Sequence, residues 1–226
     1  MTVRTSNDGD SVTPHGWETR TVSEHQHGHP HDHQHEPLGA SGGTPGPLAD
    51  ASVRTARPSD APAMGLVQAT IYRAELADVL APELLGELSG PRFAAIWRRS
   101  LERPPTPRHR LLVACAGPQV VGYVALGPVE DEPGLDPETT AMVYDGGVHP
   151  DGRGAGHGSR LLNAAVDTLR AGHDGLGFVV TWVRAEARGA LAFLQAAGFE
   201  PDGAWRERVV GDDGRTTREV RLVAEV

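Results

Sequence analysis

Apolar positions in this chain follow two periods, and each change of period marks a new element. Apolar residues three and four positions apart predict helices, which cover residues 63–76, 82–88, 92–102, 159–170 and 187–199. Short runs rich in valine, leucine and aromatic residues predict strands, which cover residues 53–57, 109–117, 119–129, 139–148 and 178–183. Two further strands are expected on either side of Asp213-Gly214, a dipeptide typical of hairpins.

The order of these elements predicts the fold class. Pro58-Ser59-Asp60 turns the first strand into a helix with Ser59 or Asp60 as its N-cap, and Gly117-Pro118 closes a hairpin. The runs at 139–148 and 178–183 flank one helix, as in a βαβ unit with parallel strands. The chain therefore reads as a mixed α/β (α+β) domain with a mostly antiparallel sheet and one central parallel βαβ unit.

Residues 1–50 do not share this pattern. They are rich in glycine, proline, serine, threonine and histidine and contain few large apolar residues, so they are predicted to be a disordered tail preceding a domain at 51–226. Six histidines alternate within HQHGHPHDHQH, from His25 to His35. This run suits loose chelation of Ni, Cu or Zn, or it is simply a solvated polar tail; no fixed metal site is predicted.

Composition narrows the function classes. The 226 residues are 38% hydrophobic and 23% charged, as in a soluble globular protein, and the formal net charge of −9 argues against a nucleic-acid-binding surface. Cys115 is the single cysteine, so no intrachain disulfide forms and a reducing cytoplasm is expected. No apolar run approaches the ~20 residues of a membrane span. The chain has no lysine, which excludes P-loop and Schiff-base chemistry.

The segment VHPDGRGAGHGSRLL, residues 148–162, carries the clearest candidate chemistry. Gly154, Gly156 and Gly158 precede a predicted helix, whose first amides have no partner within it. Bare backbone and the positive end of the helix dipole suit a bound anion. Arg153 can add charge-assisted hydrogen bonds to that anion. The glycine spacing does not match the dinucleotide pattern G-x-G-x-x-G.

These residues resemble the acyl-coenzyme A signature of the GNAT superfamily of N-acetyltransferases, R/Q-x-x-G-x-G/A. Arg153, Gly156 and Gly158 stand in its named places, and ARGALAFLQAAGF is similar to that family's A-x-x-F-Y-x-x-x-G-F segment. The likeness extends over about residues 53–226. It implies a GNAT-like fold in which the strands ending at Val148 and Val183 splay apart.

The resemblance also implies a donor site and a reaction. Acetyl-coenzyme A is expected as the acyl donor, with its pyrophosphate on the loop amides and its carbonyl polarised by a backbone N–H near Val148. The implied donor-binding residues are Val148, His149, Arg153, Gly154, Ala155, Gly156, His157, Gly158, Ser159 and Phe193. His149 is alternatively structural. An amine would attack the thioester directly, so catalysis consists mostly of positioning and proton removal.

The expected catalytic residues are Asp145 and Tyr144, and both depart from the family pattern. Asp145 is the only acid in 142–147, so it is either the base, directly or through water, or part of a bulge with Gly146-Gly147. In many family members a tyrosine acts as the general acid, and Leu194 stands at its position here, so Tyr144 or a water would protonate the thiolate. The acids at 130–132 either recognise a cationic substrate or form a solvated loop.

Three functions follow from these observations. The leading one is acetyl transfer to a primary amine of a small molecule or to an exposed amino group, by a monomer or homodimer without nucleic-acid or membrane partners. A non-catalytic acyl-coenzyme A sensor is the alternative, favoured by Leu194. A metal-handling protein based on the histidine run is the third. Cys115 lies within an apolar strand and is expected to be a buried, inert thiol.

Overall fold

The computed structural model describes residues 51–130, 132–210 and 214–226. The strands are β1 (Ala51–Thr55), β2 (Arg110–Ala116), β3 (Gln119–Pro128), β4 (Thr140–Val148), β5 (Phe178–Arg184), β6 (Glu200–Val209) and β7 (Thr216–Glu225). The helices are α1 (Ala61–Glu75), α2 (Pro82–Glu87), α3 (Gly90–Glu102), α4 (His157–Gly172) and α5 (Arg188–Ala196), with short 3-10 turns η1 (Pro58–Asp60) and η2 (Pro150–Gly152). The predicted tail and its histidine run lie outside the described residues.

One seven-stranded sheet organises the molecule, in the order β1-β2-β3-β4-β5-β7-β6. β4 and β5 are parallel, and every other neighbouring pair is antiparallel. Helix α4 connects β4 to β5, so the predicted βαβ unit and the mixed α/β fold class are confirmed. The hairpin predicted at Gly117-Pro118 joins β2 to β3, with Gly117 at φ 56°.

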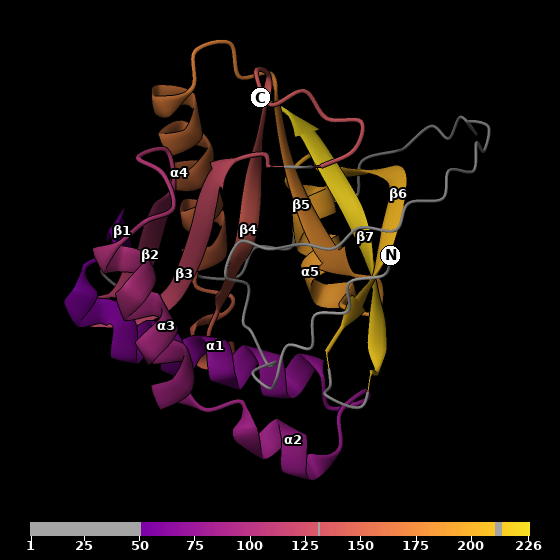
Figure 1. Ribbon diagram of the computed structural model, residues 1–226. Helices are drawn as coiled ribbons and strands as arrows, with labels where there is room; N and C mark the ends of the chain where they lie inside the picture. Colours follow the sequence, from indigo (N-terminus) through magenta and orange to yellow (C-terminus); the bar gives the residue numbers. More distant parts are fainter. Residues whose placement is uncertain (1–50, 131, 211–213) are drawn as a thin grey trace, which may run out of the picture.

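Helices cover both faces of this sheet (Figure 1). α1 and α3 pack on one face over a cluster that includes Met64, Phe93, Trp97 and Tyr123. α4 and α5 pack on the other face over a cluster that includes Leu161, Ala165 and Phe199. The apolar stripe predicted for residues 159–170 faces this second cluster, and Cys115 is buried, as expected. Among the described helices, none is long and apolar enough to cross a membrane.

Asp60 is the N-cap residue of α1, one of the two predicted alternatives, but its side chain has a different role. It precedes α1, but its side chain makes no capping hydrogen bond there. Both carboxylate oxygens instead accept from the Arg54 guanidinium, at 2.7 and 2.8 Å, and one also accepts from the Arg57 backbone N–H. The carboxylate therefore ties β1 to the turn that follows it. The Arg54 hydrogen bond holds the pKa of Asp60 below its usual range.

β4 and β5 pair over only part of their length. Their ladder runs from Thr140 opposite Phe178 to Val143 opposite Thr181, after which β4 continues to Val148 and β5 to Arg184. The strands therefore split apart toward their carboxyl ends, as the resemblance implied. We call the region between residues 144–148 and 182–184 the split.

Candidate active site

A β-bulge marks the point where β4 leaves β5. Ala125 of β3 is opposite Asp145, whereas the next residue, Leu126, is opposite Val143, so Tyr144 is an extra residue on β4. Such a bulge turns consecutive side chains to one face of the sheet. A bulge was predicted at Asp145 with Gly146-Gly147, but it lies one residue earlier, because Asp145, Gly146 and Gly147 pair in regular register with β3. Gly147 follows it, and Ile71 of α1 lies 2.7 Å from the place where a Cβ on Gly147 would be.

The Asp145 carboxylate accepts hydrogen bonds from distant parts of the chain rather than from its own backbone neighbours alone. Its Oδ2 atom accepts from Gln68 Nε2 at 2.8 Å and from the Tyr72 and Tyr123 hydroxyls at 3.0 Å each. Gln68 is oriented in turn by Trp97, whose Nε1 donates to Gln68 Oε1 at 2.8 Å. Helices α1 and α3 and strand β3 therefore fix this carboxyl at the edge of the split.

Burial dominates the electrostatics of this cluster. It raises the pKa of the Asp145 carboxyl, although the hydrogen bonds from Tyr123 and Tyr72 act in the opposite direction. Burial also raises the pKa of both tyrosine hydroxyls, and the negative charge of Asp145 adds to this. Both hydroxyls therefore remain protonated donors, and the carboxyl holds a proton to a higher pH than an exposed aspartate.

Three polar residues of α1 were not singled out from the sequence. Gln68, Tyr72 and Glu75 are spaced by four and three residues, which places them on one face of the helix. Gln68 and Tyr72 reach Asp145, and Glu75 follows one turn later. A polar stripe on an otherwise apolar helix was the available signal, but its partner, 70 or more residues away, could not be read from spacing.

Tyr144 projects from the bulge with its hydroxyl already engaged. The hydroxyl donates to the carbonyl of Pro128 at 2.5 Å, and the ring stacks on His109. Burial raises the pKa of this hydroxyl. Tyr144 would have to leave Pro128 before it could give its proton to a thiolate, so its role as an acid stays a prediction.

The glycine loop joins the end of β4 to α4. Gly154 and Gly156 have φ values of 77° and 78°, a conformation that favours glycine, and Gly156 is the N-cap of α4. The first backbone bond at this end of the helix runs from the N–H of Arg160 to the carbonyl of Gly156. The amides of residues 157–159 precede it, so they are available to an anion at the helix N-terminus.

The side chains around this loop divide between ligand-facing and structural positions. Arg153 is exposed, and its Nε donates to the carbonyl of Val148 at 3.1 Å. His149 caps η2: its backbone N–H donates to Val121, and its Nδ1 accepts from the N–H of Asp151. The structural alternative for His149 is thus supported by its contacts.

His157 and Phe193 occupy opposite environments beside the loop. His157 is only 3% exposed, so its imidazole is buried rather than presented to the loop surface. Phe193 of α5 is 38% exposed, and its ring lies 3.4 Å from where a Cβ on Gly158 would stand. A Cβ at position 158 would therefore be in ordinary van der Waals contact with this ring. Ala155 and Ser159 are exposed on the same loop.

Strand β5 forms the far wall of the split, and the β6–β7 hairpin continues the sheet beyond it. Arg206 donates to Glu219 at 2.7 Å and lies 3.5 Å from Glu132, while its guanidinium stacks 4.3 Å from the Trp182 ring. Trp182 Nε1 also donates to Glu132 at 3.0 Å. Both alternatives for Glu132, a solvated loop and a substrate contact, are therefore corrected: the side chain is buried and ion-paired. Asp131 lies outside the described residues.

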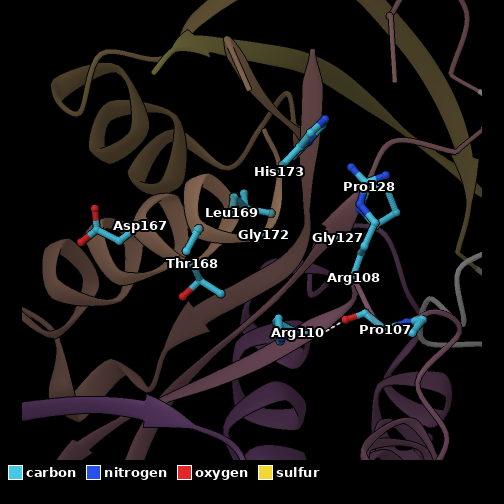
Figure 2. A pocket seen from close by; sticks show the side chains of 12 residues that line it. Pro107, Arg108, Arg110, Gly127, Pro128, Asp167, Thr168, Leu169, Gly172 and His173 are labelled. Carbon is cyan, nitrogen blue, oxygen red and sulfur yellow. Dashed lines mark hydrogen bonds between the residues drawn. The ribbon is translucent and has the colours of Figure 1, made fainter. Parts of the chain in front are cut away.

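A separate hollow of about 410 Å³ opens at the opposite end of α4 (Figure 2). Arg108, Arg110 and His173 line it together with the last turn of α4. None of the predicted site residues borders this hollow, so it is distinct from the split. No group of three or more histidine, cysteine, aspartate or glutamate side chains able to hold a metal occurs in the described parts of the chain.

The glycine loop, the split and the Asp145 cluster lie in sequence along β4 and its extension. An anion on the loop amides would be continuous with a chain lying in the split, and that chain would end beside a carboxyl able to accept a proton. This is the arrangement that the sequence resemblance implies for acyltransferases that use coenzyme A thioesters. The residues present thus suit such a donor.

Comparisons with known proteins agree with this class. The model of the acetyltransferase (GNAT) family matches residues 74–199, and the chain therefore belongs to that family. It is 32% identical over 115 residues to N-alpha-acetyltransferase RimI of Mycobacterium tuberculosis, which covers 50% of this chain and 67% of the relative.

Solved structures show the same fold. The PaiA N-acetyltransferase of Thermoplasma acidophilum, solved with coenzyme A, has a TM-score of 0.54 and 15% identity over 75% of this chain and 98% of its own. Ribosomal-protein-alanine N-acetyltransferase of Brucella melitensis has a TM-score of 0.55 and 22% identity over 77% and 99%. Family membership places this protein among the N-acetyltransferases, whose acyl donor is acetyl-coenzyme A.

Proposed function

We propose that the protein transfers an acetyl group to a primary amine of a small molecule, or to an exposed amino group of a peptide, by direct attack. The observation that carries this proposal is the split, which opens between a helix N-terminus with available amides and the half-buried carboxyl of Asp145. Direct attack by the amine requires no nucleophilic side chain of the protein. The single cysteine, Cys115, is buried in β2.

The loop would hold the donor through its backbone. The amides of residues 157–159 and the Arg153 guanidinium would bind the pyrophosphate, for which Arg153 must exchange its hydrogen bond to Val148. The donor supplies the activated acetyl thioester. A backbone N–H near Val148 would polarise the thioester carbonyl, and Phe193 would border the donor beside Gly158.

Asp145 is proposed to remove a proton from the nitrogen through a water molecule. Its Oδ2 already accepts three hydrogen bonds, so a water is better placed than the amine itself to reach the carboxyl. A second water is the simpler source of the proton for the thiolate, because Tyr144 donates to Pro128. We also propose that the protein acts in the cytoplasm as a monomer or homodimer.

A non-catalytic acyl-coenzyme A sensor is the second candidate. The observation that favours it is Leu194, which stands where many family members have a tyrosine that acts as the general acid. Leu194 instead packs against the apolar cluster beneath α4 and α5. A sensor would bind acetyl-coenzyme A without releasing thiol in the presence of any amine. The same assay therefore separates the two candidates.

The test is a screen of amines, antibiotics and peptides for thiol release from acetyl-coenzyme A. Arg153→Ala is expected to raise the KM for acetyl-coenzyme A by about tenfold, because a charge-assisted hydrogen bond to phosphate contributes ~1.5–3 kcal/mol. Arg170→Ala, exposed near the other end of α4, is the matched control and should leave this KM unchanged. An unchanged KM in Arg153→Ala would exclude Arg153 as a pyrophosphate ligand.

A further inference from the structure

Glu75 lies where four elements surround the split. It is the last residue of α1, and the segment that follows is held to β5 by Asp78, which accepts from Arg184, and to the β6–β7 hairpin by the Val79 carbonyl, which accepts from Arg215. In Figure 1, α1 lies across the lower ends of the strands, and its C-terminal end points toward β6 and β7. The end of α1 therefore bridges from β4 toward the hairpin.

Glu75 lies between Tyr72, whose hydroxyl donates to Asp145 of β4, and Asp78, which accepts from Arg184 of β5. The Glu75 carboxyl interacts electrostatically with Asp145 of β4, Arg153 of the glycine loop, Arg184 of β5 and Arg208 of β6, and it also acts on Tyr123 of β3. Arg208 itself lies 6.0 Å from the centre of the Tyr72 ring, one turn before Glu75. The end of α1 thus places Glu75 between residues that contact the two strands bordering the split.

The two carboxyls at the split differ in their hydrogen bonding. Asp145 Oδ2 accepts from three side chains, whereas Glu75, within the described part of the chain, has no hydrogen-bond or ion-pair partner at contact distance. Glu75 is also half-buried. A free, partly buried carboxylate beside a substrate opening is suited to receive an ammonium group.

We propose that Glu75 is a catalytic residue that binds the ammonium group of the acceptor and takes the proton this group must lose before attack. This inference rests on the proposed function and adds a residue to it. It also assigns the two carboxyls to different protons. Glu75 serves the first proton on nitrogen, and Asp145, through water, serves the second.

The proton and bond changes balance with these two groups. The protonated amine gives one proton to the Glu75 carboxylate, and its freed lone pair forms the new C–N bond as the C–S bond breaks. The nitrogen then loses its second proton through water beside Asp145, and a proton reaches the departing sulfur. Glu75 returns its proton to solvent after the amide leaves, so the products are the acetamide, the free thiol and one proton.

The environment of Glu75 tunes its carboxyl toward this task. Burial raises its pKa, and the negative charge of Asp145 raises it further, while Arg153, Arg184 and Arg208 oppose the rise. A carboxylate with a raised pKa is a stronger base. It acts only when ionised, so kcat/KM for the amine should rise with pH through the pKa of Glu75.

The experiment compares Glu75→Gln with Glu83→Gln, an exposed glutamate on α2, using two acceptors. An alkylamine, with a pKa of about 10 like that of lysine, arrives protonated, whereas a hydrazide arrives neutral. Glu75→Gln should lower kcat/KM for the alkylamine by about 10²-fold, and the decrease of this kcat/KM at acidic pH should disappear. It should lower kcat/KM for the hydrazide by less than about threefold. Glu83→Gln should match wild type with both acceptors.

Calorimetric binding of acetyl-coenzyme A provides the readout independent of turnover, and it should be the same in wild type and Glu75→Gln. Equal losses with both acceptors would overturn the proposal and leave Glu75 a structural residue, as would a variant as active as wild type. A wild-type protein that binds acetyl-coenzyme A but releases no thiol with any acceptor would instead refute the proposed function itself.

Discussion

At the scale of single residues, Asp145 shows how a half-buried carboxyl is retained beside an apolar cluster. An unpaired carboxylate beneath α1 would be strongly destabilising, so the chain surrounds it with donors. Gln68 would be ambiguous in orientation by itself, since its amide has both a donor and an acceptor. The Trp97 indole resolves this, because it can only donate and therefore directs the amide nitrogen of Gln68 to Asp145.

This carboxyl should leave a signature in the pH dependence of stability. Burial raises the pKa of Asp145 above its usual 3.8, so between that value and the folded pKa the native state binds more protons than the unfolded state. The contribution of Asp145 to the free energy of unfolding therefore falls as the pH rises through this window. Asp145→Asn abolishes this contribution.

The expected result is that Asp145→Asn gains stability relative to wild type as the pH rises above 3.8 toward the raised pKa of Asp145. Chemical denaturation of both proteins at several pH values measures this difference, and Asp136→Asn, in the segment between β3 and β4, is the control. A difference that moves in favour of wild type as the pH rises would mean that the hydrogen bonds, rather than burial, set the pKa of Asp145.

At the scale of elements, the position of the Asp145 donors depends on how closely α1 approaches α3. A Cβ on Gly65 would lie 2.4 Å from the carbonyl oxygen of Gly90 and 2.5 Å from the backbone nitrogen of Ala94. The contact is with backbone, which cannot rotate away as a flexible side chain can. The glycine therefore sets the distance between the two helices that deliver Gln68 and Trp97.

Gly65→Ala is expected to lower the free energy of unfolding by about 1–3 kcal/mol, because the helices must separate to admit the methyl group. Gly86→Ala in α2 is the matched control. A Cβ there meets nothing within 4 Å, so alanine should stabilise the protein by about 0.5–1 kcal/mol through helix propensity. Denaturant unfolding measures both. Equal effects of the two substitutions would contradict the close packing at Gly65.

Periodicity was sufficient to predict the elements, because each one carries its own pattern. The observed α3 begins at Gly90 rather than residue 92, and α4 at His157 rather than Ser159, differences at helix ends where glycine weakens the signal. The glycine loop was also readable, since its residues are contiguous. Gln68 and Tyr72 meet Asp145 across 77 and 73 residues, and only the packing of α1 on β4 brings them together.

At the scale of the whole molecule, the described domain contains every contact assigned to the site. β1 begins at Ala51 and pairs with β2, and both apolar clusters are built from residues after it. A chain that begins at Ala51 is therefore expected to bind acetyl-coenzyme A with a Kd within about twofold of the full chain, a change of less than ~0.5 kcal/mol.

Isothermal titration calorimetry on the two chains makes this comparison, and thermal unfolding checks that the shorter chain is folded. A folded shorter chain whose affinity falls tenfold or more would show that residues 1–50 contribute to the donor site. In that case the histidine run would need a role within the reaction rather than apart from it.

Only four residue pairs join β4 to β5, so a short ladder connects the two halves of the sheet, β1–β4 and β5–β7. Beyond Val143, β4 has no ladder partner on β5. A ligand with amide groups that binds along this edge would therefore add contacts between the two halves. The melting temperature should therefore rise with donor concentration, and backbone amide hydrogen exchange should slow in both halves of the sheet. The enzyme would be stiffest while loaded and loosest between turnovers.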